Sequence, residues 1–252
     1  MKNKVLCIIQ ARMGSTRLPG KVLKQVNGMP LLEYEISRLG RSTLVDRVVV
    51  ATTTDPSDDK VEALCKKLEV DCFRGSNEDV LERYYQCALS YPEYQTIVRV
   101  TGDCPLIDPA VIDKVIQAFN QSQVDYAANI IKETFPDGMD VEVFTLDALT
   151  RAAKEAKLQS EREHVTLFIR NNDFFKKYNL AATKNYSSYR LTVDNPEDFE
   201  VIEFLIKHTD VNATYNDFIR LLDENPEVKL KNTNIKRNEG LAKSLASDKL
   251  IK

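Results

Sequence analysis

Short apolar runs alternate with helix-like segments along the first half of this sequence, and this alternation constrains the fold most strongly. The first run, Val5 to Ile9, is continuously apolar and rich in β-branched residues, which indicates a strand buried on both faces of a sheet. Further strands are predicted at 46–54, 70–73 and 96–101, and helices at 30–39, 57–68, 77–89 and 109–119. Repeated strand-helix units predict an α/β fold with a parallel sheet flanked by helices.

The pattern changes after residue 124. Strands are predicted at 124–130, 140–144 and 178–182, and helices near 146–156 and 161–170, without regular alternation. We interpret about 124–190 as an inserted α+β subdomain within a domain that spans residues 1–228. A strand at 189–193 and helices from Pro196 and Thr214 return the chain to that domain, and residues 229–252 form a basic, polar C-terminal tail.

Composition excludes several classes of protein. The 252 residues, 43% of them hydrophobic, suit one sizeable α/β domain, and 35 Lys and Arg against 38 Asp and Glu give no basic field for nucleic acid. We find no run of roughly 20 apolar residues that would span a membrane and no signal peptide, so we expect a cytoplasmic protein. The five cysteines contain no C-x-x-C pair and are expected to be reduced.

The segment "IIQARMGSTRLPGKVL" at 8–23 places three cations, Arg12, Arg17 and Lys21, directly after the first strand. Ligands of open α/β sheets bind at the carboxyl ends of the strands, and glycines with cations suit phosphate. Five residues separate Gly14 from Gly20, which is not Walker spacing, and G-x-G-x-x-G is absent. Three cations can neutralise a triphosphate; the alternative is a solvated loop without function.

Two carboxylates follow predicted strands without an evident structural role. Asp108 and Asn195 each precede a proline that begins a helix, so both are predicted N-caps. Asp103 and Asp194 are left over, and Gly102 permits close approach of a ligand. Two carboxylates at one sheet edge fit a Mg²⁺ ion shared with substrate phosphates, although ordinary loop aspartates remain the alternative.

The opening motif resembles the signature of the sugar cytidylyltransferases, the family of CMP-sialate and CMP-deoxyoctulosonate synthetases, and most closely the spore-coat polysaccharide group. The likeness extends to Glu200 and includes "VVVAT" at 48–52, "RGSNEDVLERYY" at 74–85, "TGDCPLIDP" at 101–109, "EREHV" at 161–165 and "LTVDNPEDFE" at 191–200. It implies a Rossmann-like fold of the nucleotide-diphosphosugar transferase type, CTP and an acidic sugar as substrates, Mg²⁺ as cofactor, and a homodimer.

The resemblance also implies roles for individual residues. Lys21, Arg12 and Asp103 would be catalytic, with Lys21 on the α-phosphate and Arg12 and Arg17 on the β- and γ-phosphates. Asp103 and Asp194 would hold the metal. Further nucleotide contacts are expected from Ala11, Gly14, Ser15, Thr52, Arg74 and Gly102, with cytosine against the Ile9–Arg12 backbone and the segment near Thr52.

The sugar-binding residues implied by the resemblance are Arg83, Glu142, Glu163 and His164, the last three within the inserted subdomain, which would bind sugar or mediate dimerisation. Each has a structural alternative. His164 can be a packed or surface residue, Arg83 can be solvated on a helix, and Glu142 can shape the subdomain.

The resemblance therefore implies an enzyme that transfers CMP from CTP to an acidic, nonulosonate-like sugar for surface polysaccharide or glycan synthesis. A sugar hydroxyl would attack the α-phosphorus in line and pyrophosphate would leave. One alternative is a GT-A-type glycosyltransferase, which typically has an Asp-x-Asp motif, whereas "TGDCP" has one aspartate. Another is a non-catalytic nucleotide-binding protein, which would be expected to lack the lysine or a metal carboxylate.

Overall fold

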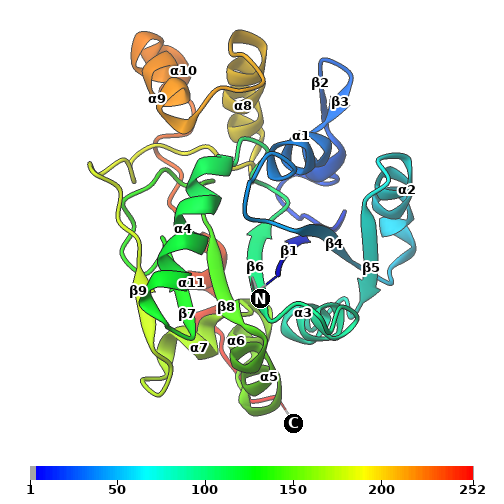
Figure 1. Cartoon of the computed structure of the whole chain (residues 1–252). Coiled ribbons are helices and arrows are strands. Elements are labelled where there is room, and N and C mark those ends of the chain that lie inside the picture. Colours follow the sequence, from blue (N-terminus) through cyan, green and yellow to red (C-terminus); the bar gives the residue numbers. More distant parts are fainter. Residues whose placement is uncertain (1–3, 252) are drawn as a thin grey trace.

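One sheet of seven strands organises the chain, and the computed structural model describes residues 4–251 (Figure 1). The strands are β1 (Val5–Gln10), β4 (Arg47–Thr53), β5 (Asp71–Gly75), β6 (Thr96–Thr101), β7 (Tyr126–Ala128), β8 (Glu142–Thr145) and β9 (Lys177–Asn179). Their order is β5-β4-β1-β6-β8-β7-β9, and only β8 runs antiparallel to its neighbours within this sheet. The predicted, mainly parallel α/β fold is confirmed.

Helices cover both faces of the sheet. One face carries α1 (Leu31–Leu39), α2 (Asp59–Lys67), α4 (Pro109–Ser122), α8 (Pro196–His208) and α9 (Tyr215–Glu224), and the other carries α3 (Val80–Leu89), α5 (Leu146–Glu155) and α7 (Leu167–Asn171). The remaining elements are η1 (Lys21–Leu23), β2 (Gln25–Val26), β3 (Met29–Pro30), η2 (Pro56–Asp58), α6 (Gln159–Glu163), α10 (Pro226–Lys229) and α11 (Glu239–Ala246).

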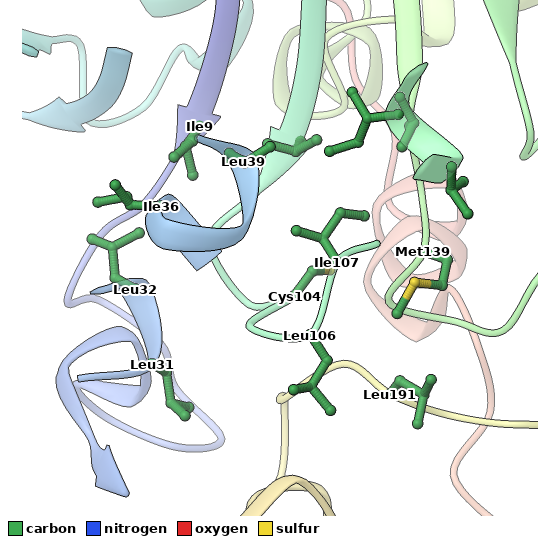
Figure 2. Packing of buried hydrophobic residues seen from close by; sticks show 14 of the residues in the cluster. Ile9, Leu31, Leu32, Ile36, Leu39, Cys104, Leu106, Ile107, Met139 and Leu191 are labelled. Carbon is green, nitrogen blue, oxygen red and sulfur yellow. The ribbon is translucent and has the colours of Figure 1, made fainter. Parts of the chain in front are cut away.

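The central strand β1 is buried on both faces, as its unbroken apolar run predicted. Val5, Cys7 and Ile9 belong to the core on the α1 side, whereas Leu6 and Ile8 belong to the core on the α3 side. Successive strand residues point to opposite faces, so a strand between two helical layers needs apolar residues at every position. Figure 2 shows Ile9 beside Ile36 and Leu39 of α1, and Cys104, Leu106 and Ile107 of the loop after β6 belong to the same core.

The helix after β6 begins as predicted. The Asp108 carboxylate accepts a hydrogen bond from the Ala110 N–H at 2.9 Å, and Pro109 is the first helical residue. The same carboxylate accepts the Tyr215 N–H at 3.0 Å, which ties the start of α9 to the start of α4. Asp108 is therefore a structural residue, which leaves Asp103 as the carboxylate of this loop for other roles.

The segment 124–190 differs from the expected inserted subdomain. Its strands β7, β8 and β9 extend the main sheet instead of forming another arrangement, because β8 pairs with β6 along residues 142–145. The helix expected over 161–170 is two helices, α6 and α7, separated where the buried Val165 adopts a left-handed φ of 51°. A β-branched residue is strained in that conformation and cannot continue a helix.

The predicted strand at 189–193 is wrong. Arg190 makes an isolated bridge with Asp137, and the segment otherwise pairs with loops. The Leu191 N–H donates to the Asp137 carbonyl at 2.7 Å, and the Val193 N–H donates to the Asp103 carbonyl at 2.8 Å. The segment has a strand-like sequence, but the backbone groups that it bonds to belong to two separate loops and not to a neighbouring strand.

The C-terminal tail is folded against the rest of the protein. It follows α10 and contains α11, and the Ile251 N–H donates to the Lys157 carbonyl at 2.8 Å, while Leu250 bridges to Leu158. In Figure 1 this red segment runs from α10 past the sheet to α5. Within residues 4–251, none of the helices combines the length and apolar character needed to cross a membrane.

Candidate active site

The loop after β1 is fixed by its own backbone and by η2. The Met13 N–H donates to the Asp58 carboxylate at 2.6 Å, and the Met13 carbonyl accepts the Gly20 N–H at 3.1 Å. Gly20 has a φ of 68°, which favours glycine, and Lys21 follows as the first residue of η1. This turn returns Lys21 to the carboxyl edge of the sheet, where it meets the loop after β6.

Gly102 brings the loops after β1 and β6 into contact. Its N–H donates to the Gln10 carbonyl at 2.8 Å, and a Cβ at this position would lie 2.9 Å from the Cβ of Ala11. The glycine was expected to admit a ligand. In the structure it admits the Ala11 Cβ and the Gln10 carbonyl at close range, which brings the loop that carries Asp103 against the loop that carries Lys21. Contact of Gly102 with a ligand stays a prediction.

Lys21 binds two carboxylates. Its Nζ lies 2.8 Å from Asp103 Oδ2 and 2.8 Å from Asp194 Oδ1, and its side chain is only 12% exposed. Burial acts to lower the pKa of Lys21, but the two carboxylates outweigh it and the pKa is raised. Burial acts to raise the pKa of Asp103, and the Lys21 ammonium overcomes it and lowers the pKa to about 2. Lys21 and Asp103 are therefore both charged at neutral pH.

Asp194 also binds two arginines, so the expectation that this carboxylate has no structural role is wrong. Asp194 lies 2.9 Å from Arg17 Nη2 and 3.1 Å from Arg190 Nη2, and Arg190 contacts the buried Asp198 at 2.8 Å. Burial acts to lower the pKa of Arg190, but its carboxylate partners, Asp198 foremost, raise it. These ion pairs hold the extended segment 189–194 against the β1 loop.

Two hollows open beside these ion pairs. The first hollow, of about 440 Å³, is lined by Gln10, Ala11, Arg12, Gly14, Ser15, Thr16, Arg17, Lys21, Val22, Thr101, Gly102, Asp103, Glu163, Asp194, Gly240 and Lys243. The second hollow, of about 250 Å³, lies next to it and includes Arg99, Cys104, Asp137, Asp140, Glu142, His164, Arg170 and Arg190 among its lining residues. Arg17, Asp103 and Asp194 line both hollows, so the carboxylates mark their junction.

Seven of the predicted nucleotide-binding residues line the first hollow: Ala11, Arg12, Gly14, Ser15, Arg17, Lys21 and Gly102. The exposed Arg12 guanidinium has no hydrogen-bond or ion-pair partner within residues 4–251, so it is available to an anion. Thr52 and Arg74 line neither hollow. Thr52 is buried in β4, and the Arg74 Nη1 contacts Asp59 at 2.7 Å on α2.

Glu142 is a buried acceptor at the wall of the second hollow. It is 2% exposed, forms an ion pair with Arg99, and accepts hydrogen bonds from Thr166 and, at 2.6 Å, from the Tyr126 hydroxyl. Burial acts to raise the pKa of Glu142, but Arg99 and other partners lower it. These partners give Glu142 a structural role beside Arg99 at the wall of the hollow, and its contact with a sugar stays a prediction.

Glu163 and His164 lie at the end of α6 and face different hollows. His164 lines the second hollow and its Nε2 lies 2.9 Å from Ser244 Oγ, while Glu163 lines the first and accepts from the same hydroxyl at 2.8 Å. Burial lowers the pKa of His164, so the ring is neutral near pH 7. The expected sugar residues are therefore divided between the two hollows.

Arg83 lies in neither hollow. It is 1% exposed within α3, and its Nη1 donates to the Ser76 carbonyl. Its Nε and Nη2 are buried without a hydrogen-bond partner in the described chain. Solvation on a helix surface, the alternative considered for Arg83, is therefore wrong, and no contact places it beside the other predicted sugar residues.

Several lining residues escaped sequence reasoning. Arg170 lines the second hollow, and its guanidinium has no hydrogen-bond or ion-pair partner in the part of the chain that the structure describes. Lys243 lines the first hollow from the C-terminal tail. Sequence does not reveal Arg190, because its neighbours resemble a strand and its partners Asp137 and Asp198 are brought to it by the fold.

Asp140 adds a group that titrates near neutrality to the second hollow. Its carboxylate forms an ion pair with Arg237, and Asp137, Glu142 and Glu133 are also nearby. Burial raises the pKa of Asp140 to about 7, against the opposing effect of Arg237. The charge of this hollow therefore changes over the physiological pH range.

The donor set at the junction fits a divalent cation. Asp103 and Asp194 already converge on one cation, since each places an oxygen 2.8 Å from the Lys21 Nζ. Within residues 4–251, no group of three or more His, Cys, Asp or Glu side chains could hold a metal ion. A Mg²⁺ ion bound here would take its remaining oxygen ligands from phosphates and water, as Mg²⁺ commonly does.

Comparison with known proteins agrees with this geometry. Residues 6–232 match the family model described as cytidylyltransferase. The spore coat polysaccharide biosynthesis protein SpsF of Bacillus subtilis is 37% identical over 237 residues, covering 89% of this chain and 96% of SpsF. A cytidylyltransferase structure from Leptospira borgpetersenii has a TM-score of 0.85 at 36% identity, covering 94% of this chain and 100% of that one.

A more distant structure shares the fold alone. A CMP:2-keto-3-deoxy-manno-octonic acid synthetase complexed with CTP has a TM-score of 0.63 at 18% identity, covering 81% of this chain and 99% of the synthetase.

Proposed function

Because this chain belongs to the cytidylyltransferase family and is a nucleotidyltransferase, we propose that it transfers CMP from CTP to an acidic, nonulosonate-like sugar and releases pyrophosphate. The product would be an activated sugar for the synthesis of a surface polysaccharide or glycan. Family membership favours this nucleotidyl transfer over the glycosyl transfer and the non-catalytic binding that the sequence left open.

The observation that carries the proposal is the junction of two hollows at Lys21, Asp103 and Asp194. A transfer between two substrates needs two adjacent sites whose common wall holds the charged groups. Placing the α-phosphate at this junction would hold it between the nucleotide in the first hollow and the acceptor in the second. Positioning of this kind supplies a large part of the barrier reduction in bimolecular transfers.

The first hollow suits a triphosphate. Arg12 and Arg17 lie on the same loop as Lys21, and Arg12 is free of protein partners within residues 4–251. Arg17 is 33% exposed on its side chain and can exchange a carboxylate for a phosphate. A synthetase that shares this fold is described as complexed with CTP, which is compatible with a nucleotide as the ligand proposed for this hollow.

The lining of the second hollow favours a negatively charged acceptor. Arg170 offers an unpaired guanidinium within residues 4–251, and Arg99 has a buried Nε without a hydrogen-bond partner there. Guanidinium groups bind carboxylates through paired hydrogen bonds. The several carboxylates that also line this hollow are mostly ion-paired, which leaves Arg170 as the available charge for an anionic sugar.

The side chains of this protein account for most of the proposed nucleotidyl transfer. When the triphosphate binds, Lys21 exchanges carboxylate oxygens for an α-phosphate oxygen and stabilises the charge that grows there in the transition state. Arg12 and Arg17 hold the β- and γ-phosphates and stabilise pyrophosphate as it leaves. Mg²⁺ bound by Asp103 and Asp194 would polarise the α-phosphate and acidify the attacking hydroxyl.

The test is a pyrophosphate-release assay with CTP, Mg²⁺ and a panel of acidic sugars, each paired with its uncharged carboxamide analogue. We expect release with at least one acid and a KM at least tenfold higher for its carboxamide. Arg170→Ala should raise the KM for the acid and leave the carboxamide unaffected. Equal use of both analogues by the unsubstituted protein would overturn the acidic-acceptor assignment, and calorimetry showing equal affinity for CTP, UTP, ATP and GTP would overturn the choice of CTP.

A further inference from the structure

The C-terminal helix α11 forms a wall of the first hollow, although it lies far from the β1 loop in sequence. Gly240 and Lys243 line this hollow together with Gly14 and Arg17. Glu239, at the first position of α11, forms an ion pair with Arg17 at 3.3 Å. The tail therefore lies against the loop that carries the predicted phosphate-binding cations.

Polar contacts hold α11 in this place. Ser244 bonds to Glu163 and to His164 of α6, and Asp248 accepts from the Ser160 N–H at 2.9 Å and from its hydroxyl at 2.6 Å. No residue of α11 is buried. A helix that is held by exposed polar contacts has a defined position, but it can shift at a small cost in free energy when a ligand binds.

Lys243 is the cation that α11 presents to the first hollow. Its ammonium is exposed and has neither a hydrogen-bond nor an ion-pair partner within residues 4–251. Glu239 and Lys243 are four residues apart, so they share one face of the helix, the face turned to the β1 loop. On this face Glu239 is paired with Arg17, so Lys243 is the charged group that is available to a ligand.

We propose that Lys243 is a further phosphate-binding residue, which binds the terminal phosphates of CTP from the side opposite Arg12 and Arg17. The inference rests on the proposed function, since it takes a nucleoside triphosphate as the ligand of the first hollow. The bound triphosphate replaces Glu239 as the partner of Arg17, and the resulting cluster of Arg12, Arg17, Lys21 and Lys243 neutralises its charge.

The test compares Lys243→Ala with Lys249→Ala by titration calorimetry with CTP and with CMP, in the absence of acceptor. Lys249 is an exposed lysine on the same tail that lines neither hollow. We expect Lys243→Ala to weaken CTP binding about tenfold, as loss of one charge-assisted contact does, and to leave CMP binding unchanged. Lys243→Arg should restore CTP binding, and Lys249→Ala should bind both nucleotides as the unsubstituted protein does.

The outcomes separate this inference from the proposed function. If the unsubstituted protein binds CTP and Lys243→Ala binds it equally well, the role of Lys243 is refuted and the function stands. An equal loss for CTP and CMP would also refute it, because CMP lacks the terminal phosphates that Lys243 is proposed to bind. If the unsubstituted protein binds no CTP, the proposed function itself fails.

Discussion

Lys21 and Arg17 share the carboxylate of Asp194, but their substitution should affect different kinetic constants. Lys21 is expected to act on charge that develops in the transition state, whereas Arg17 holds a phosphate that is charged throughout. Lys21→Ala should lower kcat roughly a hundredfold or more, by analogy with removal of one oxyanion donor. Arg17→Ala should mainly raise the KM for CTP. A change confined to KM in Lys21→Ala would contradict the assignment.

Asp103 and Asp194 should both be required for turnover. Asp103→Asn and Asp194→Asn keep hydrogen-bonding capacity near Lys21 but remove the charge that a divalent cation needs. We expect pyrophosphate release to fall at least a hundredfold in each, with circular dichroism showing an unchanged fold. Near-normal release at saturating Mg²⁺ by either variant would show that the carboxylate does not hold the metal.

Asp140 should make acceptor binding depend on pH. Its pKa is raised to about 7, so it is mostly protonated below this pH and negative above it. Because the added charge repels an anionic acceptor, the KM for an acidic sugar should rise as the pH increases through 7, while the KM for CTP changes less. Asp140→Asn, measured across pH 6 to 8, should remove this dependence; an identical pH profile in the variant would assign the effect to another group.

At the scale of elements, Gly138 fixes the segment that carries Arg190 and Asp194. Gly138 has a φ of 98°, and a Cβ there would lie 2.5 Å from the carbonyl carbon of Leu191. Gly28, in the β2-β3 turn, is a matched control because its φ is also positive, at 77°, with nothing within 4 Å of an added Cβ.

Gly28→Ala should therefore cost only the left-handed strain, about 1 to 2 kcal/mol of unfolding free energy. Gly138→Ala should cost about 1 to 3 kcal/mol more, from overpacking against the backbone, and should also reduce kcat/KM because the segment bearing Asp194 must move. Urea unfolding and steady-state kinetics on both variants check this. Equal stability losses would show that the contact with Leu191 is unimportant.

The best-predicted elements are those whose sequence pattern is compatible with only one kind of structure. The unbroken apolar run of β1 and the Asp-Pro pair at α4 fit only a doubly buried strand and a capped helix. The segment 189–193 alternates like a strand, yet its partners are loops whose positions depend on the whole fold. The break between α6 and α7 depends on the left-handed Val165, which a sequence of helix-compatible residues does not reveal.

At the scale of the whole molecule, the site was predictable where its residues follow strands directly. The motifs after β1 and β6 bring Lys21 and Asp103 together, because the parallel strands β1 and β6 end at one edge of the sheet. Asp194 reaches the same place from an extended segment that is not a strand, so the strand predicted at 189–193 gave the wrong reason for its position. The role of the tail was not predictable. Glu239 meets Arg17 across 222 positions of sequence, and no local pattern indicates such a contact. The homodimer stays a prediction, which light scattering would check through twice the mass of one chain.

The central claim is that the α-phosphate of CTP passes to an acidic sugar at the junction of the two hollows. The most direct measurement supplies CTP labelled at the α-phosphate together with the acidic sugar that gives pyrophosphate release, and follows the label by chromatography and mass spectrometry. We predict that the label enters a CMP-sugar in a one-to-one ratio with pyrophosphate, and that Lys21→Ala forms this product at least a hundredfold more slowly. Release of the label as free CMP or CDP, with no sugar conjugate for any acidic sugar in the panel, would contradict the account.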